Sequence, residues 1–193
     1  MKAVVQDTYG SAAVLETRGI DRPEIGDDEV LVRVRAAGVN PADWAIVSGL
    51  PYIARPVYGL RKPKNAVRGT DVAGTVEAVG TGVTRFQSGD EVFGWCSGLG
   101  GAFAEYAAVS EDALAPKPTN LTFEQAATVP MAGLVALQAL RDHGGVRAGQ
   151  KVLINGASGG IGTFAVQIAK ALGVEVTGVC STRNVDIDRK SVV

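Results

Sequence analysis

Residues 157–162 read Ala-Ser-Gly-Gly-Ile-Gly, a spacing of small residues that suits contact with a pyrophosphate. The hexad matches the pattern G-x-G-x-x-G with Ala, the next smallest side chain, in the first place. Gly159 lets the backbone approach phosphate oxygens, and Gly162 lets a helix lie close to the preceding strand, because neither has a Cβ atom. The candidate cofactor-binding turn therefore consists of Ala157, Ser158, Gly159, Gly160, Ile161 and Gly162.

The segments on both sides of this turn are those that a dinucleotide site needs. Residues 152–154 are an apolar run, as expected of a parallel strand covered on both faces. A helix with one apolar face follows, Gly173 ends it, and residues 174–179 begin a second strand. The free N–H groups at the start of that helix favour an anion. This order predicts dinucleotide binding, and the alternative is a tight glycine turn in a sheet without a ligand.

The end of the second strand indicates which dinucleotide is bound. An acidic residue that contacts the adenosine ribose is expected about 20 positions after the last glycine. The offset of 18 from Gly162 leads to Cys180, and Ser181, Thr182 and Arg183 follow it without a carboxylate. Two hydroxyls and a guanidinium suit a 2′-phosphate, so we expect NADPH rather than NADH. The alternative is that Arg183 is a solvated loop residue.

The composition is ordinary for a globular protein. The chain has 193 residues, of which 46% are hydrophobic and 20% charged, with a formal net charge of −1. These averages predict neither a nucleic-acid partner nor a membrane partner. The N-terminus does not resemble a signal peptide. Cys96 and Cys180 are far apart in sequence, so we expect no disulfide and a cytoplasmic location.

The first part of the chain has the rhythm of short strands. Alternating or short apolar runs are separated by glycines and turn residues, over residues 30–39, 72–80, 91–94 and 104–109. Such runs predict a partly open β-barrel over residues 1–121. Thr122 and Gln125 then form a capping-box pattern, and an Ala- and Leu-rich helical run, interrupted at Pro130, extends to about His143. We expect residues 122–150 to join the barrel to an incomplete Rossmann domain, a doubly wound parallel sheet, over residues 151–193.

Several stretches, in this order, resemble the medium-chain dehydrogenase/reductase superfamily, specifically its zinc-free, quinone oxidoreductase-like branch. They are AGVNPAD at residues 37–43, GTDVAGTVEAVG at 69–80, VTRFQSGDEV at 83–92, AATVPMAG at 126–133, and the glycine hexad. The similarity extends from residue 1 to about 184. It implies a GroES-like, alcohol dehydrogenase-like barrel with the nucleotide domain inserted within it.

The resemblance also argues against zinc. Zinc-dependent relatives place Cys after Gly-Val and His after Gly, where this chain has Asn40 and Thr70. Neither is a ligand that Zn²⁺ prefers. The single histidine, His143, is expected at a solvated helix end, and Cys96 as a small packed side chain. We therefore predict no metal site, and a zinc alcohol dehydrogenase is the disfavoured reading.

Without zinc, the resemblance implies hydride transfer from NADPH to a quinone or an α,β-unsaturated carbonyl, as in enoyl reductase domains. It places Asn40 near the nicotinamide and the acceptor, where its amide could donate to the developing oxygen anion. The alternative for Asn40 is a turn residue that caps its own backbone. Asp43 is a candidate proton relay or simply a solvated carboxylate. Many relatives carry Tyr five places after this Asn, whereas the present chain has Ala45.

Two further residues complete the candidate site. Tyr52, in an insertion-like loop at residues 51–58, could cover the substrate pocket or could be a packing residue. Thr128 resembles the position that approaches the nicotinamide ribose.

The resemblance implies a longer protein, because relatives have roughly 300 residues or more. Residues 185–193 show no convincing helical continuation. We expect the 193-residue chain alone to be poorly stable and inactive, and the longer protein to form homodimers. A non-catalytic NADPH-binding or redox-sensing module is the alternative function.

Overall fold

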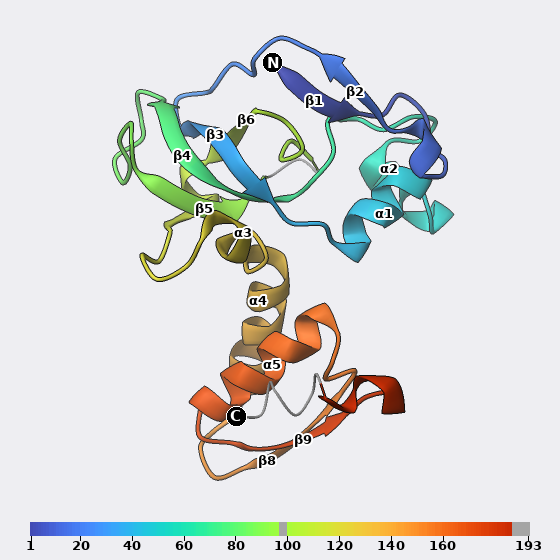
Figure 1. Cartoon of the computed structure of the whole chain (residues 1–193), viewed down its shortest axis with the longest axis vertical. Coiled ribbons are helices and arrows are strands. Elements are labelled where there is room, and N and C mark those ends of the chain that lie inside the picture. Colours follow the sequence, from blue (N-terminus) through green and yellow to red (C-terminus); the bar gives the residue numbers. More distant parts are fainter. Residues whose placement is uncertain (97–99, 187–193) are drawn as a thin grey trace. The chain divides into compact units, whose positions relative to one another are not determined.

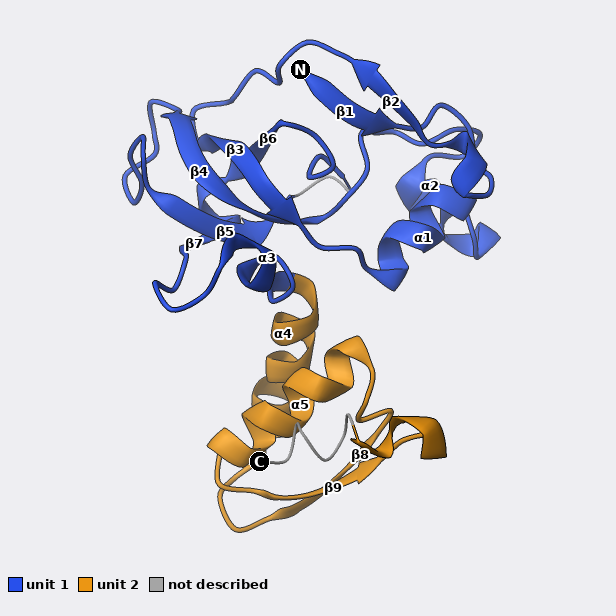
Figure 2. Ribbon diagram, viewed as in Figure 1, with its two compact units in different colours: residues 1–130 blue, residues 131–193 orange. Residues whose placement is uncertain are grey.

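A computed structural model describes residues 1–96 and 100–186. It divides into two compact units, residues 1–130 and residues 131–193 (Figure 2). The division, between residues 130 and 131, falls within residues 122–150, the segment predicted to join two domains. Each unit is described below by itself.

The first unit is built on a five-stranded antiparallel sheet in the order β6-β3-β4-β5-β7 (Figure 1). Its strands are β3 (Glu29–Ala37), β4 (Asp71–Val79), β5 (Glu91–Trp95), β6 (Tyr106–Ser110) and β7 (Leu114–Pro116). Alternate side chains of β3 and β4 point into one apolar core, which includes Val30, Val32, Val72 and Val76. This is the alternation from which these two strands were predicted, while β5 and β6 were predicted as shorter runs.

A second, two-stranded sheet consists of β1 (Lys2–Val5) and β2 (Glu16–Gly19), with the short 3-10 helix η1 (Ala12–Val14) between them. Isolated bridges join β1 to the loops around the larger sheet, pairing Ala3 with Ala104 and Val5 with Val67. In the described part of the chain, these strands form no closed barrel. The predicted partly open arrangement of strands is therefore confirmed.

A small helical lobe interrupts the strands between β3 and β4 (Figure 1). It contains α1 (Pro41–Ser48), the 3-10 helix η2 (Tyr52–Ala54) and α2 (Arg55–Tyr58). Asn40 is the N-cap of α1, Pro41 is its first residue, and Gly49 ends it with a φ of 66°. Proline at the first position and a left-handed glycine after the last are the ordinary boundary signals of a helix.

The joining segment begins within the first unit. The predicted capping box is confirmed: Thr122 accepts from the N–H of Gln125, and its own N–H donates to the Gln125 side chain. It begins α3 (Phe123–Ala126), after the 3-10 helix η4 (Glu111–Ala113) that precedes β7. Pro130 starts the next helix rather than interrupting one.

The second unit contains α4 (Pro130–Leu137), the π-helical turn η5 (Gln138–His143), β8 (Lys151–Asn155), α5 (Gly160–Ala171), β9 (Glu175–Val179) and the 3-10 turn η6 (Thr182–Asn184). Strands β8 and β9 are parallel. Their alternate residues Val152, Ile154 and Val176 pack with α5 and α4. Leu153, on the other face, is 66% exposed, so only one face of this strand pair is covered. The predicted strand, turn, helix and strand are present. The expectation of no helical continuation was made for residues 185–193, of which Val185 and Asp186 are helical and the rest lie outside the described residues.

Candidate functional site

Asn40 stands where the chain leaves β3 and enters α1. Its side-chain Nδ2 donates to Asp71 Oδ2 at 3.1 Å and lies 3.5 Å from Thr70 Oγ1. Asp71 is the first residue of β4, the strand that pairs with β3, and Thr70 directly precedes it. A contact of 3.5 Å is at the limit of a hydrogen bond, so Asp71 is the group that orients the amide. Asn40 therefore occupies the N-cap position of the helix, and its side-chain amide belongs to a polar cluster.

Asp43 is buried, with 4% of its surface exposed. The reading of Asp43 as a solvated carboxylate is therefore wrong. Its Oδ2 accepts the backbone N–H of Asn40 at 2.7 Å, and its Oδ1 lies 3.5 Å from Thr70 Oγ1. A carboxylate three residues after the N-cap accepts the cap's free N–H and is drawn inward with it.

The pKa of Asp43 is raised above its ordinary value, chiefly by burial. The hydrogen bond from Asn40 opposes this effect, and the negative charge of Asp71 adds to it. A raised pKa makes the buried carboxyl a better proton carrier near neutral pH than an exposed aspartate.

Two charged residues of this cluster were not among the predicted site residues. Asp71 is fully buried, and Arg68 has only 1% of its surface exposed. Among the described residues, none of the three side-chain nitrogens of Arg68 finds a hydrogen-bond acceptor. Its positive charge lowers the pKa of Asp43, while burial lowers the pKa of Arg68 itself. Cys96 is also buried here, and burial raises the pKa of its thiol to about 12, so it is a packed side chain as expected.

Thr128 belongs to a segment that packs beside Asn40. A Cβ atom on Gly38, two residues before Asn40, would lie 2.5 Å from the carbonyl oxygen of Ala127 and 3.1 Å from Asp71 Cβ. Thr128 itself is exposed, and its hydroxyl donates to the carbonyl of Gln125 at 2.8 Å. Gly38 thus brings the 126–128 segment next to the polar cluster.

Tyr52 is 69% exposed and lies in η2, beyond the far end of α1 from Asn40. Its ring stacks on the guanidinium of Arg55, with the centroid at 4.6 Å. The structure gives no contact between Tyr52 and Asn40 or Asp43 in the described part of the chain. Tyr52 therefore remains a prediction as a catalytic residue.

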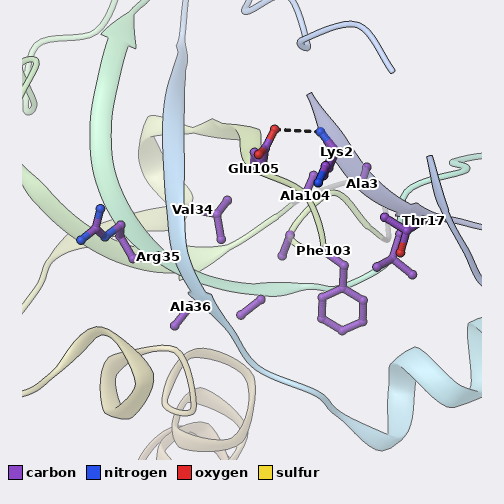
Figure 3. Close-up of a pocket in the computed structure, with 12 residues that line it drawn as sticks. Lys2, Ala3, Thr17, Val34, Arg35, Ala36, Phe103, Ala104 and Glu105 are labelled. Carbon is purple, nitrogen blue, oxygen red and sulfur yellow. Dashed lines mark hydrogen bonds between the residues drawn. The ribbon is translucent and has the colours of Figure 1, made fainter. Parts of the chain in front are cut away.

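A shallow groove of about 370 Å³ lies elsewhere in the first unit (Figure 3). It runs between β1 and the second half of β3, and Phe103, Val34, Arg35 and Thr17 are among the residues that line it. None of the predicted site residues lines this groove, so the groove is separate from the candidate site.

The glycine turn of the second unit has the shape that a pyrophosphate needs. Gly159 is the N-cap of α5, which begins at Gly160. A Cβ on Gly162 would lie 2.1 Å from the carbonyl oxygen of Gly156, whereas one on Gly160 would have nothing within 4 Å. Gly162 thus holds the helix against the turn, and the space beside Gly160 is open above the free N–H groups of the first helical turn. The residues present fit a dinucleotide phosphate group.

The end of β9 lies beside this turn. Asn184 donates from Nδ2 to the hydroxyl of Ser158 at 3.2 Å, which ties η6 to the glycine turn. Ser181 is the N-cap of η6, and Arg183 is exposed within it. No ion pair engages Arg183 in the described part of the chain, so its guanidinium is accessible.

The described residues contain no group of three or more His, Cys, Asp or Glu side chains placed to hold a metal ion. None of the helices in the described ranges is long and apolar enough to cross a membrane.

Comparison with known proteins identifies the family. Residues 26–119 match the model of the alcohol dehydrogenase GroES-like domain. The chain is 38% identical to a chloroplast envelope quinone oxidoreductase homolog from Arabidopsis thaliana, over 96% of the chain and 57% of that protein.

Among solved structures, a quinone oxidoreductase from Coxiella burnetii superposes with a TM-score of 0.89 at 34% identity, over 99% of this chain and 60% of the other. The Escherichia coli quinone oxidoreductase complexed with NADPH gives 0.84 at 29% identity, over 99% and 56%. The chain spans little more than half the length of these relatives. Its sequence and both of its units thus show that the chain belongs to the medium-chain dehydrogenase/reductase superfamily, among the quinone oxidoreductase-like proteins.

Proposed function

We propose that this chain is the N-terminal part of an oxidoreductase that transfers a hydride from NADPH to a quinone or an α,β-unsaturated carbonyl without zinc. The observation that carries the proposal is the buried polar cluster of Asn40, Asp43, Thr70 and Asp71, which offers amide, hydroxyl and carboxylate groups where a zinc enzyme needs thiolate and imidazole. The similarity to quinone oxidoreductases, one of them solved with NADPH, supports it.

Each residue has a distinct part in this proposal. Bound NADPH supplies the hydride. Asp71 orients the Asn40 amide through one of its two N–H bonds. The other, which has only the 3.5 Å contact to Thr70 Oγ1, would donate to the oxygen of the acceptor as negative charge develops there. That oxygen then takes up a proton, and Asp43, with its raised pKa and its neighbour Thr70, can hold and pass on one.

The direct test is Asn40→Ala in the longer protein that we propose contains this chain. Removal of one preorganised donor lowers kcat by roughly 10²-fold, because the bond is strongest in the transition state. NADPH oxidation on addition of 1,4-benzoquinone measures the effect, and Asn120→Ala, which changes an exposed asparagine, is the control. An unchanged kcat in Asn40→Ala would remove Asn40 from the reaction.

The cofactor preference is tested at the end of β9. Arg183→Ala is expected to weaken NADPH binding by about tenfold and to leave NADH binding unchanged, since only NADPH carries the 2′-phosphate. Nucleotide fluorescence titration of both cofactors gives the two dissociation constants. Equal losses for both would show that Arg183 does not read the 2′-phosphate.

The alternative is a module that binds NADPH and reports redox state without catalysis. It predicts NADPH binding but no NADPH consumption when a quinone is added. The open space above Gly160 and the accessible Arg183 favour nucleotide binding in either case, so the quinone-dependent rate separates the two functions.

A further inference from the structure

The helical lobe turns its apolar side chains toward solvent. Helices η2 and α2 follow one another directly over residues 52–58. Tyr52, Ile53, Pro56 and Val57 are exposed, and their spacing of i, i+1, i+4 and i+5 places them on one side of these two turns. Ala54, Arg55 and Tyr58, on the other side, are half-buried. Ile53 is 88% and Val57 is 58% exposed. A helix usually buries its apolar side, whereas the apolar side of these two turns faces solvent.

Basic side chains continue this surface. Leu60 is 73% exposed and is followed by the exposed Arg61, Lys62 and Lys64. The sequence has no acidic residue between Asp43 and Asp71. Asp7 is near enough to interact with Lys62, but its hydrogen bond and ion pair go to Arg18. In the described part of the chain, none of the ion pairs involves the three basic residues, so their charge is uncompensated.

Contacts of Arg55 and Tyr9 hold the lobe in this arrangement. The guanidinium of Arg55 lies between the rings of Tyr9 and Tyr52, with centroids at 4.7 and 4.6 Å, and its Nε donates to the Gly49 carbonyl at 3.0 Å. The Tyr9 hydroxyl donates to the carbonyl of Gly59 at 2.5 Å. These contacts fix both ends of the 49–59 segment, so its apolar side is displayed by packing beneath it.

We propose that residues 52–64 form a docking surface for an anionic lipid bilayer. Protruding aliphatic and aromatic side chains next to uncompensated Lys and Arg are the combination that lies at a membrane interface. The positive charge opposes pairing of this surface with a second copy of itself. The net charge of −1 predicted no membrane partner. That value is a sum over the whole chain, so it does not reveal a local cluster of positive charge such as Arg61, Lys62 and Lys64. The inference is independent of the proposed chemistry.

Flotation of the longer protein that we propose contains this chain, mixed with vesicles, tests the surface. Vesicles of phosphatidylcholine that contain about one-third phosphatidylglycerol, an anionic lipid, are compared with vesicles of pure phosphatidylcholine. The chain is expected to float only with the anionic vesicles and to be released by about 0.5 M NaCl, where the Debye length falls to a few Å.

Two variants separate charge from insertion. Each variant is expected to lower the partition coefficient between vesicles and water by roughly tenfold or more. The first variant removes charge, Arg61→Gln/Lys62→Gln/Lys64→Gln, and the second removes apolar side chains, Ile53→Ser/Val57→Ser. Arg141→Gln/Arg147→Gln/Lys170→Gln, which removes three exposed basic residues of the second unit, is the matched control and keeps binding within about threefold. The proposal is overturned by no flotation, by equal flotation on neutral vesicles, or by equal losses in the control. Self-association that depends on Ile53, or selective binding to an acidic peptide without binding to vesicles, would also overturn it.

Discussion

Gly162→Ala is expected to destabilise the protein by about 3 kcal/mol and to weaken NADPH binding by at least roughly tenfold. The added Cβ would lie 2.1 Å from the Gly156 oxygen and 2.8 Å from two backbone atoms of Ala157. Backbone atoms cannot move aside as the end of a flexible side chain can, so α5 must separate from the turn. That movement displaces the N–H groups that we expect to face the pyrophosphate.

Gly160→Ala is the matched control, because its Cβ meets nothing within 4 Å and Gly160 is the first helical residue. It should melt at or slightly above the parent temperature, since alanine favours the helix. A loss of NADPH affinity in Gly160→Ala without a loss of stability would show that the phosphate approaches at this point. If Gly162→Ala unfolds in urea at the parent midpoint, the close approach of helix and turn does not hold the unit together.

The part of the fold that the sequence predicts is the part determined by local pattern. Alternation gives β3 and β4 because each has one face on the core, and the glycine hexad gives the turn between β8 and α5 because its spacing has a direct steric meaning. The strands β1 and β2 were not predicted. Each has only four residues, and their pairing joins segments that no local pattern connects.

Helix α1 was missed for a different reason. Asn40 was considered only as a site residue or, alternatively, as a turn residue, although asparagine before proline is also the start signal of a helix. Once the helix forms, Asp43 accepts the N–H of its cap and becomes buried, which reverses the expectation of a solvated carboxylate. The three-residue spacing between Asn40 and Asp43 could have indicated that the Asp43 carboxylate accepts the N–H of the helix cap.

Arg68 could not be recognised from its sequence context. It follows the exposed basic residues Arg61, Lys62 and Lys64 and resembles one more of them. Its backbone N–H, however, donates to the carbonyl of Val4 in β1, and its side chain is buried. Burial of an arginine depends on the pairing of residues 67 and 68 with residues 4 and 5, more than 60 positions away. The electrostatic balance of the candidate site therefore becomes visible only in the structure.

Arg68→Met is expected to change how stability depends on pH. Burial already raises the pKa of Asp43, so the folded state holds that proton more tightly than the unfolded state. Stability from this group is present at low pH and is lost as pH rises through the folded pKa. Arg68 lowers the pKa of Asp43, and without it the pKa rises further and the loss becomes deeper. Because Arg68 is the smallest of the influences on this carboxyl, we expect the variant to be about 1 kcal/mol less stable than the parent near pH 8.

The difference should close in acid. Once pH falls below the raised pKa of Asp43, the folded carboxyl is protonated in both proteins. The variant also no longer buries an unpartnered guanidinium, so it should then be at least as stable as the parent. Arg68→Lys keeps the charge and should keep the parent profile, whereas adding Asp43→Asn to Arg68→Met should restore part of the stability near pH 8, because a neutral amide needs no cation. Urea unfolding between pH 4 and 8 measures all four proteins. Parallel profiles for the parent and Arg68→Met would show that Arg68 does not balance the buried carboxylate beside Asn40, and the polar cluster would then owe its geometry to hydrogen bonds alone.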